Sequence, residues 1–137
     1  MRLLYIANIR IPTEKAHGIQ IMKTCEVLAG HGIGIELIVA KRHNPLDGNP
    51  FLFYDVKQCF KFHRIRCIDF LIIPFFKKIG FVLESISFYF VAKYYIYHHS
   101  ADIYYTRDLL LALVLPKEKL FYEVHWLPEK LRWYHRR

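Results

Sequence analysis

The chain lacks the short motifs that mark most self-contained catalysts and metal sites. Its 137 residues contain no G-x-G-x-x-G, no P-loop, no G-x-S-x-G and no H-E-x-x-H. The dinucleotide-binding fingerprint, the Walker phosphate loop, the nucleophile elbow and the helical zinc site are therefore all missing. We expect no metal ion and no bound cofactor, and neither hydrolysis nor phosphoryl transfer by this chain alone.

Cysteine is scarce. Cys25, Cys59 and Cys67 make an odd count without a C-x-x-C pair, which argues against a secreted disulfide framework and against a cysteine zinc site. The apolar run near the start has no small-residue cleavage site, so it predicts a strand and not a signal peptide. We expect a cytoplasmic protein.

Long uncharged runs are also missing. Residues 68–99 are very apolar and aromatic, but no window of about eighteen residues is free of charge, so no transmembrane span is expected. Two interpretations remain for residues 81–98. One is a helix buried against a sheet. The other is an interfacial helix whose aromatic side chains touch lipid while Lys77, Lys78 and Lys93 meet headgroups.

Acidic residues are few. The 12 Asp and Glu against 20 Lys and Arg give a formal net charge of +8, which favours a phosphate-bearing partner or an anionic membrane face. The basic residues are scattered, and neither zinc-ligand spacing nor an RNP-like aromatic motif accompanies them. We therefore expect no nucleic-acid partner.

Apolar runs and helical patterns alternate along the chain, which is 54% hydrophobic and 23% charged and has a length typical of one folded domain. The patterns predict helices from Gly18 to about residue 29, over 81–98 and over 109–115, and strands over 3–7, 33–40, 60–67, 102–105 and 120–123. Turn formers at 41–50 predict an exposed loop. The expected fold is α/β, a Rossmann-like open parallel sheet with helices on both faces.

Polar residues follow three of the predicted strands, at the edge where open parallel sheets bind ligands. They lie in residues 8–18, 106–108 and 123–125. Gly18 is expected to open a helix whose free N–H groups suit a phosphate or a hydroxyl-rich ligand; alternatively, it only makes a tight turn. Arg107 suits a carboxylate or a phosphate, or it forms an ion pair with Asp108 or Asp102.

These segments resemble the amino-terminal domain of the retaining family 4 glycosyltransferases, which have the GT-B fold. The matching segments, in order, are Ile11-Pro12-Thr13-Glu14-Lys15-Ala16-His17-Gly18-Ile19-Gln20, Tyr105-Thr106-Arg107-Asp108 and Glu123-x-His125. The resemblance spans essentially the whole chain. It implies that residues 1–137 are an acceptor-side domain that ends within its final helix, and that the donor-binding carboxyl-terminal domain is absent.

The resemblance also implies roles for individual residues. His125 would be the catalytic histidine beside the transferred sugar. The alternative, from its position after a buried strand alone, is a histidine that caps a helix or packs in the core. From the spacing, Glu123 is expected to orient His125 where the local backbone bends. The residues expected to contact substrate are His17, Gly18, Arg107, Asp108 and Glu123.

The implied reaction moves a sugar from a nucleotide sugar, a co-substrate and not a cofactor, to a sugar, lipid-linked or other acceptor. The chain alone is expected to be inactive, and to lie in the cytoplasm or at the inner face of the membrane. The alternative, from a different class, is a non-catalytic α/β binding module. Such a module would be a truncated relic or a membrane-surface adaptor that uses the aromatic stretch and the basic residues 130–137.

Overall fold

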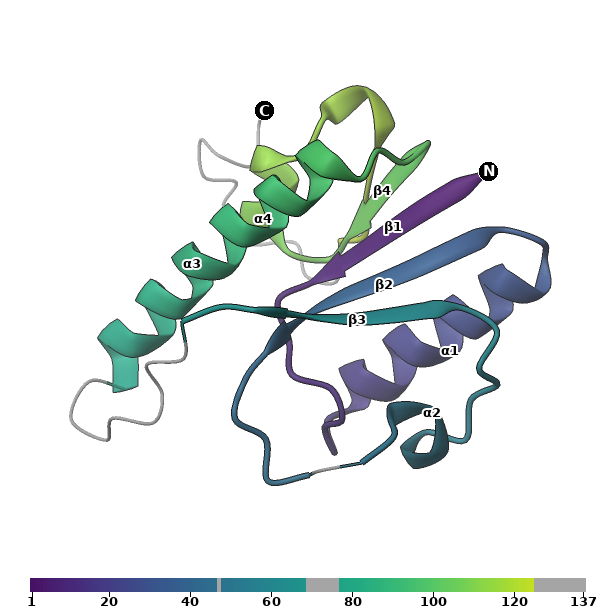
Figure 1. The fold of residues 1–137 in the computed structure, drawn as a ribbon, viewed down its shortest axis with the longest axis horizontal. Helices are drawn as coiled ribbons and strands as arrows, with labels where there is room; N and C mark the ends of the chain where they lie inside the picture. The colour runs from purple at the N-terminus through teal and green to yellow at the C-terminus, as the bar shows by residue number, and fades with distance from the viewer. Residues whose placement is uncertain (47, 69–76, 125–137) are drawn as a thin grey trace.

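The computed structural model describes residues 1–46, 48–68 and 77–124. In this part of the chain five strands form one open sheet in the order β3-β2-β1-β4-β5, and every neighbouring pair is parallel (Figure 1). The strands are β1 (Arg2–Ala7), β2 (Gly34–Lys41), β3 (Lys61–Arg66), β4 (Ile103–Thr106) and β5 (Leu120–Tyr122). The expected Rossmann-like α/β class and all five predicted strands are confirmed.

Helices cover both faces of the sheet. Figure 1 shows α1 (Ala16–Gly30) and α2 (Pro50–Phe53) on one face, and α3 (Lys77–His98) and α4 (Leu109–Val114) on the other. A short 3-10 helix, η2 (Lys117–Lys119), leads into β5. The first two connections between strands therefore return over one face of the sheet, and the last two return over the other face.

The central strand β1 is buried on both of its faces. Leu3, Tyr5 and Ala7 belong to the core cluster under α1, whereas Leu4 and Ile6 belong to the cluster under α3. Successive side chains of a strand point to opposite faces, so a strand covered twice needs an unbroken apolar run. This is why residues 3–7 have no polar alternation.

Two helix boundaries and one loop differ from the predictions. Helix α1 begins at Ala16, so Gly18 lies inside it and does not open it. Helix α3 begins at Lys77, ahead of the predicted start at residue 81. The predicted loop 41–50 ends in α2, because Asn49 accepts a hydrogen bond from the Phe51 backbone N–H (2.9 Å) and caps the helix while Phe51 packs in the core.

Helix α3 has one buried and one exposed side. Phe88 and Ala92 pack against the sheet, whereas Phe90 is 70% exposed and Tyr97 is 85% exposed. The buried side agrees with the interpretation of residues 81–98 as a helix packed on the sheet, and contact of the exposed aromatic side chains with lipid stays a prediction. Among the described residues, no helix has the length and apolarity needed to cross a membrane.

A buried carboxylate joins four elements at the amino-terminal end of the sheet. Glu36 of β2, with a side chain 6% exposed, accepts hydrogen bonds from Arg2 Nη2 of β1 (2.7 Å) and from Tyr95 Oη of α3 (2.5 Å). His63 Nε2 of β3 lies 3.2 Å from the same carboxylate. Burial alone would raise the pKa of Glu36, but the hydrogen bonds from Tyr95 and Arg2 outweigh it and lower the pKa.

We predict that Glu36→Gln lowers the free energy of unfolding at neutral pH by about 1–3 kcal/mol, because charge-assisted hydrogen bonds are lost. The folded-state pKa of Glu36 lies below its ordinary value of 4.5. Its stabilising contribution is therefore present above that pH and is lost as the pH falls through the folded-state pKa. Urea denaturation at a series of pH values measures this.

The matched control is Glu118→Gln, at an exposed carboxylate of η2. It should change the stability little and leave its dependence on acid pH as in the wild type. If Glu36→Gln loses stability on acidification as steeply as the wild type does, the role given to this carboxylate is wrong.

Candidate functional site

The order of the strands places the ligand-binding crevice expected for this fold between β1 and β4. From β1 the chain continues to β2 and β3 on one side, whereas β4 and β5 lie on the other side. The loops that follow β1 and β4 therefore leave toward opposite faces, and the expected crevice lies between them, at the carboxyl ends of these strands. Asn8 follows β1, Arg107 follows β4 and Glu123 follows β5.

Arg107 is the centre of a polar cluster on the α1 side of this crevice. Its Nη2 donates to Gln20 Oε1 (3.0 Å) and its Nε lies 3.5 Å from Glu123 Oε2. Tyr105 Oη donates to the same Glu123 oxygen (2.6 Å). Burial, together with this carboxylate, raises the pKa of Tyr105 to about 12, so the phenol stays protonated and remains a donor.

The predicted partners of Arg107 have other hydrogen bonds. Asp108 caps α4, because its carboxylate accepts from the backbone N–H of Leu110 (2.9 Å) and of Leu111 (3.3 Å). Asp102 accepts from the backbone N–H of Arg2 (2.7 Å). The ion pair of Arg107 with Glu123 joins the ends of β4 and β5, which sequence spacing did not indicate.

His17 lies half-buried in the first turn of α1. Burial lowers its pKa, and the positive charges of Lys15 and Arg107 lower it further. A histidine with a lowered pKa is neutral at neutral pH, so its imidazole can donate one hydrogen bond and accept another.

Gly18 is needed for packing. It is buried, and its N–H donates to the Lys15 carbonyl (2.9 Å), so this N–H is not free for a ligand. A Cβ at this position would lie 2.6 Å from Thr13 Cγ2 and closer still to Tyr54 Oη. Tyr54 Oη in turn donates to the Thr13 carbonyl (2.7 Å). Neither of the two sequence interpretations, a helix start or a tight turn, describes this position.

A second polar cluster lies on the α3 side of the same edge. Arg42 Nη2 donates to Asn8 Oδ1 (2.7 Å), and Asn8 Nδ2 donates to Ser85 Oγ of α3 (3.2 Å). Arg42 Nε contacts Glu84 Oε1, and the Glu84 side chain is completely buried. Sequence reasoning missed this ion pair. The signal in the sequence was the one carboxylate of a mostly apolar helix. A carboxylate that such a helix buries needs a cationic partner.

The structure thus brings His17, Arg107 and Glu123 together and adds Gln20 and Tyr105 to them. Gly18 faces Thr13 and Tyr54, and Asp108 is occupied with the α4 cap, so ligand contacts of these two stay predictions. His125 lies outside the described residues. Within those residues, no group of three or more His, Cys, Asp or Glu side chains is placed to hold a metal ion.

Comparisons with known proteins give no match. No family model, no curated protein and no solved structure matches the chain. The α/β class is established by the strand order and pairing alone.

We predict that Gly18→Ala lowers the free energy of unfolding. Forcing a methyl group into a packed site costs about 1–3 kcal/mol, which exceeds the gain in helix propensity of up to about 1 kcal/mol. The control is Gly30→Ala at the other end of α1, where an added Cβ meets nothing within 4 Å. Urea unfolding followed by circular dichroism should give a loss for the first variant and none for the second. Equal stability of the two variants would contradict the packing role.

We also predict that the pKa of His17 is below the ordinary value of 6.5, and that Arg107→Gln raises it by removing a nearby positive charge. Titration of the imidazole protons by NMR measures both values. Lys93→Gln, on the exposed side of α3, is the control and should leave the pKa of His17 unchanged. An unaltered pKa in Arg107→Gln would show that the two groups do not interact.

Proposed function

We propose that the chain is the acceptor-side domain of a GT-B glycosyltransferase that transfers a sugar from a nucleotide sugar to an acceptor. The observation that carries this proposal is the cluster of His17, Arg107 and Glu123 beside the crevice between β1 and β4. These residues come from the three segments that resemble the family 4 enzymes. In a Rossmann-like sheet, this crevice is where ligands bind.

The cluster has the chemistry to bind a ligand rich in hydroxyl groups. Glu123 accepts hydrogen bonds, Arg107 donates them, and a neutral His17 does both. Tyr105 and Arg107 orient the Glu123 carboxylate. Several convergent donors and acceptors of this kind recognise a sugar hydroxyl by paired hydrogen bonds.

In this proposal, the chain's own residues bind and orient the acceptor. Breaking the bond between the sugar and the nucleotide requires donor contacts, which a second Rossmann-like domain would supply across the crevice. His125, by resemblance, would lie next to the transferred sugar and stabilise the charge that develops there. Acceptor binding, which this chain performs, is therefore separate from donor binding, which the second domain performs.

The test uses the chain by itself with two classes of ligand. Isothermal titration with common nucleotide sugars should give no micromolar affinity, because the donor contacts lie elsewhere. NMR titration with a panel of neutral mono- and oligosaccharides should shift the amide signals of Gln20, Arg107 and Glu123. Arg107→Gln should weaken sugar binding about tenfold, the loss of one hydrogen bond to a charged group.

Lys93→Gln is again the control, because it removes an exposed charge from α3, which lies on the other face of the sheet from α1. It should leave sugar binding as in the wild type. Micromolar binding of a nucleotide sugar by this chain would contradict the division into two domains. Sugar-induced shifts that avoid the cluster would contradict the acceptor site.

A further inference from the structure

A small basic hollow opens at the carboxyl ends of β2 and β3, beside the loop that follows β1. It has a volume of about 250 Å³, and its described lining residues are Arg10, Ile11, Ala40, Lys41, Arg42, His43, Asn44, Leu46 and Arg64. No Asp or Glu is among them. The described side chains that line this space are therefore cationic or neutral.

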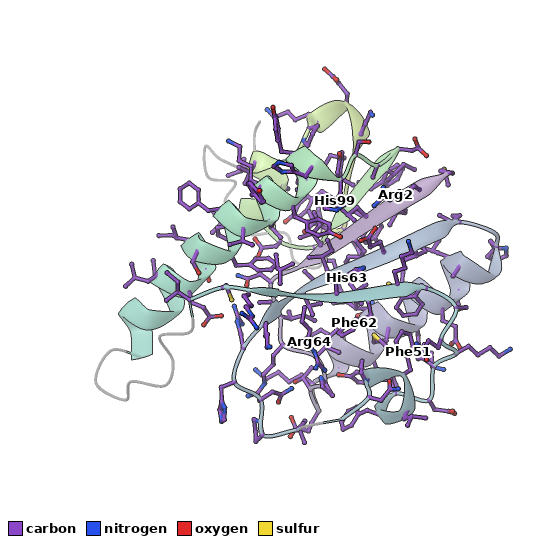
Figure 2. All side chains as sticks on the ribbon, in the orientation of Figure 1. Arg2, Phe51, Phe62, His63, Arg64 and His99 are labelled. Atoms are coloured by element: carbon purple, nitrogen blue, oxygen red, sulfur yellow. The ribbon has the colours of Figure 1, made fainter. Side chains whose placement is uncertain are left out.

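The walls of the hollow are tied together. Asn44 Nδ2, in the loop after β2, donates to the Pro12 carbonyl in the loop after β1 (2.7 Å). Arg64 Nη2 of β3 donates to the Ile11 carbonyl (3.0 Å), and its guanidinium lies 5.4 Å from the centre of the Phe62 ring. Figure 2 shows Arg64 and Phe62 on the same side of β3, with His63 on the other side. The fork of Arg64 is thus held in place before any ligand arrives.

The positive charge of the hollow is not balanced within the described part of the chain. Arg42, which also lines the hollow, is paired with the buried Glu84. In contrast, no carboxylate of the described residues lies within ion-pair distance of Arg10, Lys41 or Arg64. Three like charges around one small space repel one another, and a bound anion would relieve that repulsion.

We propose that this hollow is a binding site for one phosphoryl group. The planar guanidinium group of an arginine can donate two parallel hydrogen bonds to two phosphate oxygens, and a lysine ammonium adds a positive charge. The hollow is smaller than the pockets of about 300–1,000 Å³ that enclose a whole drug-sized ligand. Apart from the imidazole of His43, its described lining offers no ring on which a nucleobase could stack. The site therefore binds the phosphoryl group itself and not a base attached to it. This phosphoryl site does not depend on the proposed function.

The phosphoryl group has two sources, a solute or the headgroup of a lipid. The first arm titrates inorganic phosphate into the ¹⁵N-labelled chain, with chloride at matched ionic strength as the reference. We expect saturable shifts of the Arg10, His43 and Arg64 amide signals, and weaker binding as salt is added. The second arm measures co-sedimentation with phosphatidylcholine vesicles that contain phosphatidic acid. Binding to these vesicles that inorganic phosphate competes away identifies the lipid as a source.

Arg10→Gln is the main variant, because the Arg10 side chain has no hydrogen bond or ion pair with the described residues that its loss would break. It should weaken phosphate binding about tenfold. Arg64→Lys keeps the charge but loses the fork, and it should weaken binding to a smaller extent. Lys61→Gln removes a charge from the opposite end of β3 and should leave binding unchanged. Phosphate shifts no larger than those of chloride, or an equal loss in Lys61→Gln, would overturn the proposal.

Discussion

The position of β1 in the middle of the sheet is the constraint on which the rest of the structure depends. It pairs in parallel with β2 on one side and with β4 on the other, and both of its faces are buried. Parallel pairing on both sides requires that every connection return over a face of the sheet, which places helices on both faces. The same pairing brings the loops after β1 and β4 to one edge, where ligands are expected to bind in this fold.

The two ends of the sheet differ in their chemistry. At the amino-terminal end, Glu36 accepts hydrogen bonds from Arg2 and Tyr95, so its buried charge is compensated. At the carboxyl end, Arg10, Lys41 and Arg64 gather without a described carboxylate to balance them. Paired charges hold elements together, whereas an unbalanced group of like charges stabilises the fold little and favours a ligand.

The sequence predicts what local patterns determine. The apolar run at residues 3–7 and the helical spacing of Ile21, Met22 and Cys25 are local, and both appear in the structure. Contacts between distant residues leave no such pattern. The fit of Gly18 against Tyr54 depends on how α1 meets α2.

The candidate site divides in the same way. The strand ends that carry Arg107 and Glu123 followed from the predicted sheet, because the carboxyl ends of parallel strands share one edge. Their ion pair with each other did not follow, and neither did the pairing of Arg42 with Glu84. Both depend on which residues of two separate elements come within ion-pair distance, which only the assembled fold determines.

The pairing of β1 also imposes an order in time on folding during synthesis. Thr106 of β4 donates its hydroxyl to the carbonyl of Ile6, 100 residues earlier in the chain. A ribosome adds about 5–20 residues per second. The strand that pairs with the second edge of β1 is therefore synthesised roughly 5–20 s after β1 itself. During that interval its backbone N–H and C=O groups are an open template for other extended chains. The edge of β1 that pairs with β4 therefore stays open until β4 has left the ribosome.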